Sequence, residues 1–136
     1  MRGAPAWPAG TLELGLLDGE GLFTRFEDPF SLLHGPQGGA HVPLAYQVHG
    51  RSADDALFVL RVRRVRDGLL VYRSDTRFFV SGEVWTDGRP AFLCPPLQDL
   101  RLGGELLSFE VLVFNAEGAF LATATVRSTT FDPLCN

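Results

Sequence analysis

The amino-acid sequence predicts an all-β fold, and two observations support this prediction. Apolar and polar residues alternate with a period of two in several segments between Thr11 and Phe131, whereas no stretch longer than a turn or two has the spacing of an amphipathic helix. Clusters of Gly, Pro, Asp and Asn separate these segments, as turns separate strands. About eight short strands in 136 residues are typical of an immunoglobulin-like antiparallel β-sandwich, in which two sheets pack together.

The alternating segments place the strands along the chain. Residues 1–10 are rich in Ala, Pro and Gly and do not alternate, so we expect a flexible lead there and a single β-sandwich domain over residues 11–136. Trp7 in the lead is predicted to be an exposed contact residue or to pack onto an open sheet edge. The predicted strands lie near residues 11–17, 30–33, 41–49, 57–66, 69–81, 90–94, 105–114 and 119–131.

The hairpin around Asp67-Gly68 has two possible registers. A two-residue turn would place Leu60 opposite Asp75 and bury charge, so we expect an odd-length loop with Gly68 in the left-handed region. One face then carries Phe58, Leu60, Val62, Leu70, Tyr72, Phe78 and Val80. The opposite face carries Arg61, Arg63, Arg73, Asp75 and Arg77 among Val59, Val65 and Val71.

Two further turns are predicted. A turn at residues 86–89, beside Trp85, would join two short strands. A four-residue turn at residues 115–118 would place Phe114 opposite Ala119. With the turn at residues 115–118, the buried face of this hairpin pairs Val113 with Phe120, Val111 with Ala122, Phe109 with Ala124 and Leu107 with Val126. Its outer face pairs Glu110 with Thr123 and Ser108 with Thr125.

Composition argues against several functions. The net charge is −4 and the pI about 5.3, which gives no electrostatic basis for binding nucleic acid. No apolar run approaches the roughly eighteen residues of a membrane-spanning helix. The usual catalytic and nucleotide-binding motifs are absent, so we expect neither an enzyme nor a cofactor. A triad recognised by geometry alone stays open.

Four arginines are candidate ligand-binding residues: Arg61, Arg63, Arg73 and Arg77. On one sheet face they could hold an acidic protein or a carboxylated or phosphorylated surface polymer through bidentate contacts. The alternative is an ordinary solvated face. Asp75 within the stripe favours that alternative, and so does the complete lack of lysine, because every basic surface position is then an arginine.

The segment His34-Gly-Pro-Gln-Gly-Gly-Ala-His41 is the most unusual in the chain. It suits a stiff turn between two strands, and this interpretation is favoured. Alternatively His34 and His41 could converge on a metal ion, with Cys94 or a carboxylate as a further ligand. Cys94 and Cys135 could form a disulfide or remain free, buried thiols.

The segments Leu12-Glu13-Leu14-Gly15 and Phe26-Glu27, the motif from His34 to His41 and the turn Asn115-Ala116-Glu117-Gly118 resemble a family of uncharacterised predicted lipoproteins of myxobacteria and their relatives. The resemblance spans most of the chain from Thr11, and the H-G-P-Q-G-G-x-H motif is its distinctive part. It implies export and attachment to the cell envelope, and it supplies no catalytic residues. The chain has no signal peptide or N-terminal lipidated cysteine, so a cytoplasmic location is also open.

These observations favour a non-catalytic β-sandwich interaction module of the bacterial cell envelope that binds a protein or surface polymer. The alternative is a small metal- or ligand-binding protein that uses the turn from His34 to His41. Open sheet edges predict either a monomer or a weak dimer.

Overall fold

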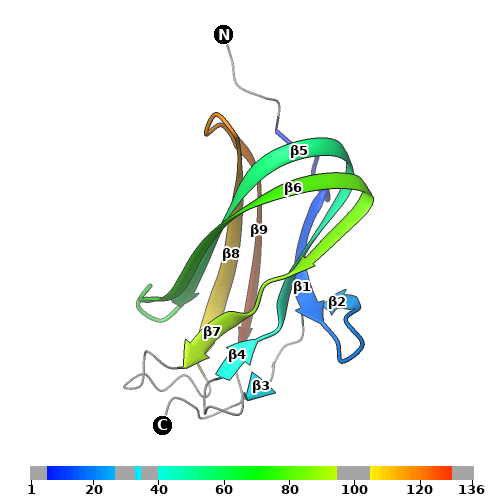
Figure 1. Cartoon of the computed structure of the whole chain (residues 1–136). Coiled ribbons are helices and arrows are strands. Elements are labelled where there is room, and N and C mark those ends of the chain that lie inside the picture. Colours follow the sequence, from blue (N-terminus) through cyan, green and yellow to red (C-terminus); the bar gives the residue numbers. More distant parts are fainter. Residues whose placement is uncertain (1–5, 27–32, 35–39, 95–104, 130–136) are drawn as a thin grey trace.

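The computed structural model describes residues 6–26, 33–34, 40–94 and 105–129, and all regular structure in these ranges is β-strand. None of these residues belongs to a helix that could cross a membrane. Six strands form one antiparallel sheet and three form another (Figure 1), so the predicted all-β antiparallel, sandwich-like fold is confirmed. The strands are β1 (Leu12–Leu17), β2 (Phe23–Arg25), β3 (Leu33–His34), β4 (Ala40–Val42), β5 (Leu44–Arg64), β6 (Leu70–Gly88), β7 (Ala91–Cys94), β8 (Leu106–Asn115) and β9 (Phe120–Thr129).

The strands β5 and β6 are long and bend together, as the arch in Figure 1 shows. The predicted strand at 41–49 therefore divides between the end of β4 and the start of β5, and β5 continues through the predicted strand at 57–66. The turn predicted at 86–89 is wrong because β6 continues to Gly88. Gly50 and Gly82 have positive φ angles of 71° and 99°, and the β5–β6 register shifts just beyond Gly50. A bulge with left-handed glycines bends a strand without ending its pairing. The segments around Gly50 and Gly82 therefore resemble turns in the sequence, although the strands continue through them.

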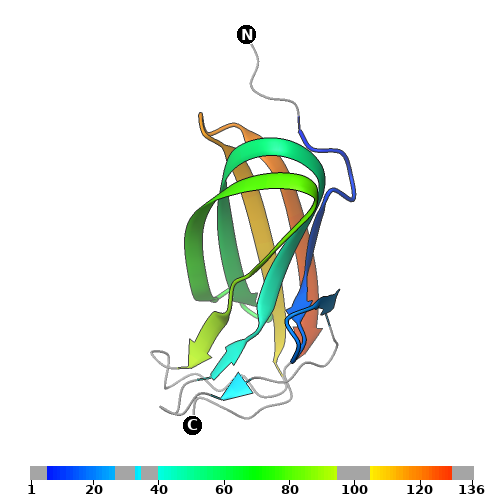
Figure 2. The same ribbon diagram turned by 45° about the vertical axis from the view of Figure 1, so that its right-hand side comes forward.

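The bend divides the six-stranded sheet into two layers that face each other (Figure 2). In one layer the second half of β5 lies between β6 and β8, with β9 beyond β8. In the other layer the first half of β5 lies between β1 and β6, with β2 beyond β1. The main layers are thus halves of one sheet rather than the two separate sheets that the sequence predicts. The small sheet of β3, β4 and β7 lies at one end.

Apolar side chains from both layers fill the space between them. The ring of Tyr46 stacks on that of Phe58 with centroids 5.0 Å apart, and Phe26 contacts Phe109 at 4.8 Å. Full burial of a large apolar side chain contributes about 1.5–3 kcal/mol, so this core is the main source of stability. Its other fully buried large members are Leu44, Leu60, Leu93, Leu107, Val42, Val48 and Val62.

Trp7 belongs to this core. The residue is only 6% exposed, its backbone N–H donates to the carbonyl of Leu121 at 2.8 Å, and the guanidinium of Arg51 lies 5.4 Å from the centre of its ring. Of the two alternatives for Trp7, packing onto an open edge is therefore the one observed. The segment before β1 extends the edge of β9 at this point.

The body of the β5–β6 hairpin has the preferred phase, since Leu60 lies opposite Ser74, and Gly68 has a φ of 72°, as predicted. The predicted odd length of the loop is wrong: the N–H of Arg64 donates to the carbonyl of Leu69 at 2.8 Å and encloses four residues, and the register shift in β6 restores the phase. Leu70 is an exception: a register shift places it away from the core face with 40% of its surface exposed, while Val71 is buried. The predicted positions of these two residues are wrong because the bulge inserts one residue into β6.

The β8–β9 turn is shorter than predicted. The N–H of Asn115 donates to the carbonyl of Ala119 at 2.8 Å, so three residues and not four form the loop. A register shift follows, and Val113 faces Ala122 instead of Phe120. Each predicted pair in the body of the hairpin is displaced by two residues. Since two residues is the period of a strand, the odd-numbered residues of β8 still occupy the buried face.

Candidate binding surface

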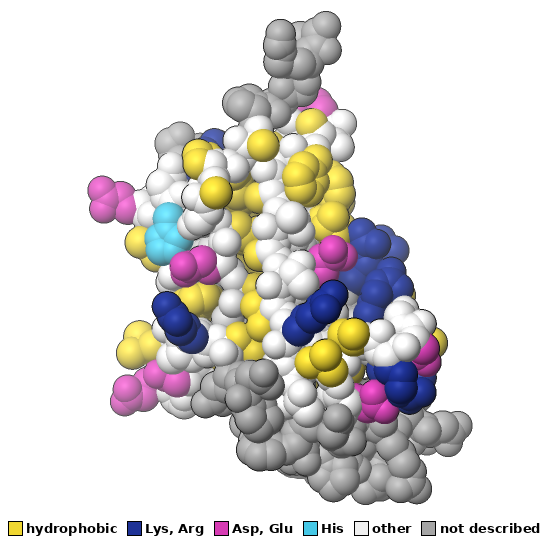
Figure 3. All heavy atoms as spheres, turned by 180° about the vertical axis from the view of Figure 1, so that it is seen from behind, with side chains coloured by type: hydrophobic (Ala, Val, Ile, Leu, Met, Phe, Trp, Pro, Cys, Tyr) yellow, Lys and Arg dark blue, Asp and Glu magenta, His cyan; other side chains and the backbone are white. Residues whose placement is uncertain are grey.

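The four predicted arginines lie on one outer face of the sheet, which we call the arginine face. Arg61 and Arg63 come from β5, Arg73 and Arg77 from β6, and Arg61 lies directly opposite Arg73. The strands β8 and β9 continue this face. In Figure 3, which shows the molecule from behind, basic side chains gather toward the side that carries the β5–β6 hairpin. The structure therefore brings the predicted residues together.

Three of these arginines are already near carboxylates. Arg73 donates from Nε and Nη2 to both carboxylate oxygens of Asp75, at 3.0 and 3.1 Å. The buried Nε of Arg61 forms no hydrogen bond within the described part of the chain. Arg77 lies 3.6 Å from Asp55, and Arg61 lies 3.8 Å from Glu110. Exposed ion pairs contribute only about 0–1 kcal/mol to stability, so these long contacts leave guanidinium donors for a ligand.

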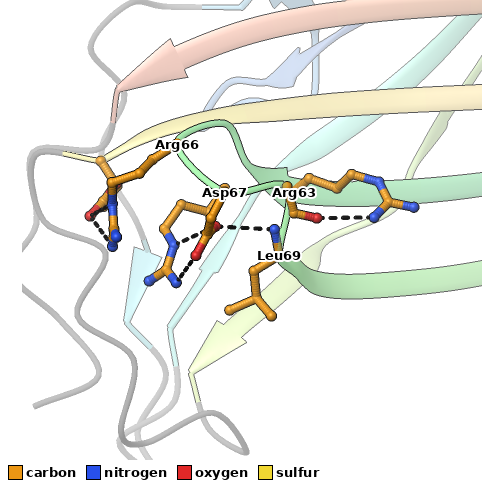
Figure 4. Close-up of polar contacts among 7 residues, drawn as sticks. Arg63, Arg66, Asp67 and Leu69 are labelled. Atoms are coloured by element: carbon orange, nitrogen blue, oxygen red, sulfur yellow. Dashed lines mark hydrogen bonds and ion pairs between the residues drawn. The ribbon is translucent and has the colours of Figure 1, made fainter.

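One cross-strand row of the arginine face carries two arginines around a hydroxyl group. Ser108 of β8 lies between Arg63 of β5 and Arg127 of β9. Arg63 donates from Nη1 to the carbonyl of Gly68 at 3.1 Å (Figure 4), and Arg127 is exposed and has no ion pair among the described residues. Both guanidinium groups keep several free N–H donors. Sequence reasoning did not identify Arg127, although its alternation with Thr123 and Thr125 marks it as outward-facing.

The tip of the β5–β6 hairpin is a network of charged contacts (Figure 4). Arg64 donates from Nε and Nη2 to the two oxygens of Asp67 at 3.1 and 2.6 Å, and Asp67 also accepts the N–H of Leu69 at 3.1 Å. The hydrogen bond from Arg64 and then that from the Leu69 N–H lower the pKa of Asp67 to about 2. Arg66 contacts Glu105 at 3.0 Å and ties the tip to the segment before β8.

A groove separates β9 from β1 and β2. Its volume is about 570 Å³, which lies in the range of small-molecule sites. Leu14, Phe26 and Val126 contribute apolar surface, whereas Glu13 and Arg25 contribute charge. The sequence contains no signal for this groove, because its walls come from opposite ends of the chain.

A separate cluster of polar groups lies against the core. Burial raises the pKa of Tyr46 above its ordinary range and also raises that of Asp87, which lies opposite Tyr46 in the β5–β6 ladder. The nearby guanidinium of Arg89 partly opposes the change at Asp87, since its Nε lies 3.2 Å from the carboxylate. Arg89 also lies 4.8 Å from the ring centre of Phe78. None of these residues lines the groove.

The predicted metal ligands are only partly described. The β3–β4 register pairs His34 with Ala40 and His41 with Leu33, so the two histidines are not direct cross-strand partners. Residues 35–39, the side chain of His34 and the choice between a Cys94–Cys135 disulfide and two free thiols lie outside what the structure describes. Within the described ranges, no three His, Cys, Asp or Glu residues gather as metal ligands would. Metal binding at this turn stays a prediction.

No protein-family model and no curated protein matches the sequence. The likeness to predicted lipoproteins stays a prediction. The functional argument therefore depends on the geometry of the arginine face.

Proposed function

We propose that the protein is a non-catalytic interaction module that binds an acidic polymer or an acidic protein surface through the arginine face. The observation that carries this proposal is the row in which Arg63 and Arg127 flank Ser108. Arginines on the two strands that flank Ser108 offer guanidinium donors to carboxylate or phosphate oxygens. Arg61 adds positive charge to the same face, although its own Nε is buried and faces Glu110 at 3.8 Å.

The charge of this face supports an anionic ligand. Five arginines lie on the outer face of β6, β5, β8 and β9, against three carboxylates, Asp55, Asp75 and Glu110. The whole chain has a net charge of −4, so this excess of positive charge is local. A local patch of this kind attracts anions at low ionic strength, and salt screens the attraction.

The envelope location belongs to the same proposal. It is supported by the motif from His34 to His41 and the other segments that resemble predicted lipoproteins. Protease treatment of intact and lysed cells tests it. Digestion of the protein only after lysis, with no membrane-associated fraction, would contradict it.

Titration with polygalacturonate and with polyphosphate tests the ligand class, with uncharged dextran as the comparison. We expect binding that weakens with salt, and at least about tenfold weaker binding in the Arg63→Gln/Arg127→Gln variant, because charged hydrogen bonds each contribute about 1.5–3 kcal/mol. The single variants Arg63→Gln and Arg127→Gln are compared with Arg25→Gln, which also removes one positive charge, since Arg25 is an exposed arginine on β2. Equal loss in all three single variants would show that only overall charge matters and would overturn the proposal.

A further inference from the structure

The strand β6 has an open edge. Among the described strands, β6 pairs only with β5, whereas β5 has neighbours on both sides. Figures 1 and 2 both show β6 at the front of the molecule with no strand beyond it. Within the described ranges, no other strand pairs with the backbone groups on this edge, and such groups can pair with a further strand.

The middle of this edge is regular. From Tyr72 to Val80 the pairing with β5 continues without a register shift, and the two shifts lie outside this stretch. Natural edges are often protected by bulges, and this stretch has none. Phe79 within it is 65% exposed, the most exposed of the large hydrophobic residues described. The stretch is therefore suited to pairing with another strand.

The same stretch is complementary to itself about Thr76. In an antiparallel pair of two copies centred there, Asp75 of each copy faces Arg77 of the other, and Arg73 faces Phe79. The inward-facing residues match as well, since Tyr72 would face Val80. The side chains of Asp75 and Arg77 are 45% and 54% exposed, so both remain accessible despite their contacts within the chain.

Neighbouring registers are less favourable. Centring the pair on Asp75 would place Asp75 against itself and Arg73 against Arg77, and centring it on Arg77 would place Arg77 against itself. Like charges directly opposite each other destabilise a sheet. Centring it on Ser74 pairs Arg73 with Asp75 but soon reaches the register shift near Leu70. The centre at Thr76 alone combines opposite charges with the full regular stretch.

We propose that this chain forms a two-fold symmetric dimer in which the β6 strands of two copies pair antiparallel about Thr76. The occupant of the open edge is thus a second copy of this chain. The dimer does not use the row of Arg63 and Arg127 that carries the proposed function, although Arg73 and Arg77 of the arginine face lie in the paired stretch.

Charge reversal and sedimentation velocity on the full chain test the dimer. We expect a concentration-dependent dimer for the unaltered protein, and association weakened about tenfold or more in Asp75→Arg and in Arg77→Asp, since each change makes two like-charge contacts. Mixing the two variants restores opposite charges at both contacts, so a heterodimer should form. Arg127→Asp is the control, because it changes the charge of the same face away from the edge.

Every other outcome of these measurements contradicts a dimer centred on Thr76. A monomer at every concentration, dimers that persist in both single variants, or a mixture that stays monomeric would overturn the proposal. A dimer lost in Asp75→Arg but kept in Arg77→Asp would assign the centre to Ser74. Thermal unfolding of each variant shows that it is folded, and the mixed sample reports on pairing even where a single variant is less stable.

Discussion

At the residue scale, one short polar side chain organises each of three turns. Asp18 accepts the N–H groups of Glu20 and Leu22 at 2.8 and 2.9 Å, in the turn between β1 and β2. Asn115 accepts those of Glu117 and Ala119 at 3.0 and 2.8 Å. Asp67 accepts the Leu69 N–H in the β5–β6 hairpin. Asp and Asn bond to nearby backbone N–H groups in turns, and the sequence predicts a turn at Asp67 and at Asn115 but not the one at Asp18.

Asp67 provides a pH-dependent prediction. Its pKa in the folded protein, about 2, lies below the ordinary 3.8, so its contribution to stability is present above about pH 4 and is lost as the pH falls through 2. The titration midpoint of its carboxyl carbon in NMR spectra should lie near 2. In Arg64→Gln, which removes the main cause, the midpoint should rise. A midpoint near 3.8 in the unaltered protein would show that the ion pair does not persist in solution.

At the element scale, the sequence predicts which face of a strand is buried but not where a strand bulges. Alternation identified the buried residues of β8, although the predicted partners in β9 are displaced by two. Leu70 and Val71 exchange places because a bulge changes the phase of the alternation. A bulge depends on contacts with the neighbouring strand, so the local sequence does not contain its position.

Gly15 in β1 provides a test of such a contact. A Cβ atom at this position would lie 2.6 Å from the ring of Phe23 and would also clash with the backbone oxygen of Thr24. We expect Gly15→Ala to lower the free energy of unfolding by about 1–3 kcal/mol, as overpacking does. Gly19→Ala, where nothing lies within 4 Å, should change it by less than about 0.5 kcal/mol. Urea denaturation of both variants measures the difference, and equal values would mean that β2 does not pack on Gly15.

At the scale of the whole molecule, the segment before β1 joins the two layers. Trp7 is hydrogen-bonded to β9, and the next residues lead directly into β1, which belongs to the other layer. The segment therefore covers one end of the gap between β1 and β9, and the groove opens along the rest of that gap. The sequence offered both an exposed and a packed Trp7, because the lead has no alternation to decide between them.

Replacing Trp7 tests this role. Trp7→Ala should lower the free energy of unfolding by about 3–5 kcal/mol, as for other buried Trp side chains, and Trp7→Phe should cost less because it refills much of the space. Denaturant unfolding followed by far-ultraviolet circular dichroism measures both. A loss below about 1 kcal/mol in Trp7→Ala would show that the segment contributes little to the core in solution.

The sequence by itself determined the all-β class, the buried faces of β5, β6 and β8 apart from Leu70 and Val71, the phase of the body of the β5–β6 hairpin and the common face of Arg61, Arg63, Arg73 and Arg77. These properties follow from a period of two and from turn residues, which act over a few positions. Only the tertiary structure decided that one bent sheet makes both layers, that Arg127 joins Arg63 in the row of Ser108, and that no described strand pairs with the second edge of β6. The physical reason is that pairing between distant strands depends on contacts across the whole chain, and no local pattern records them.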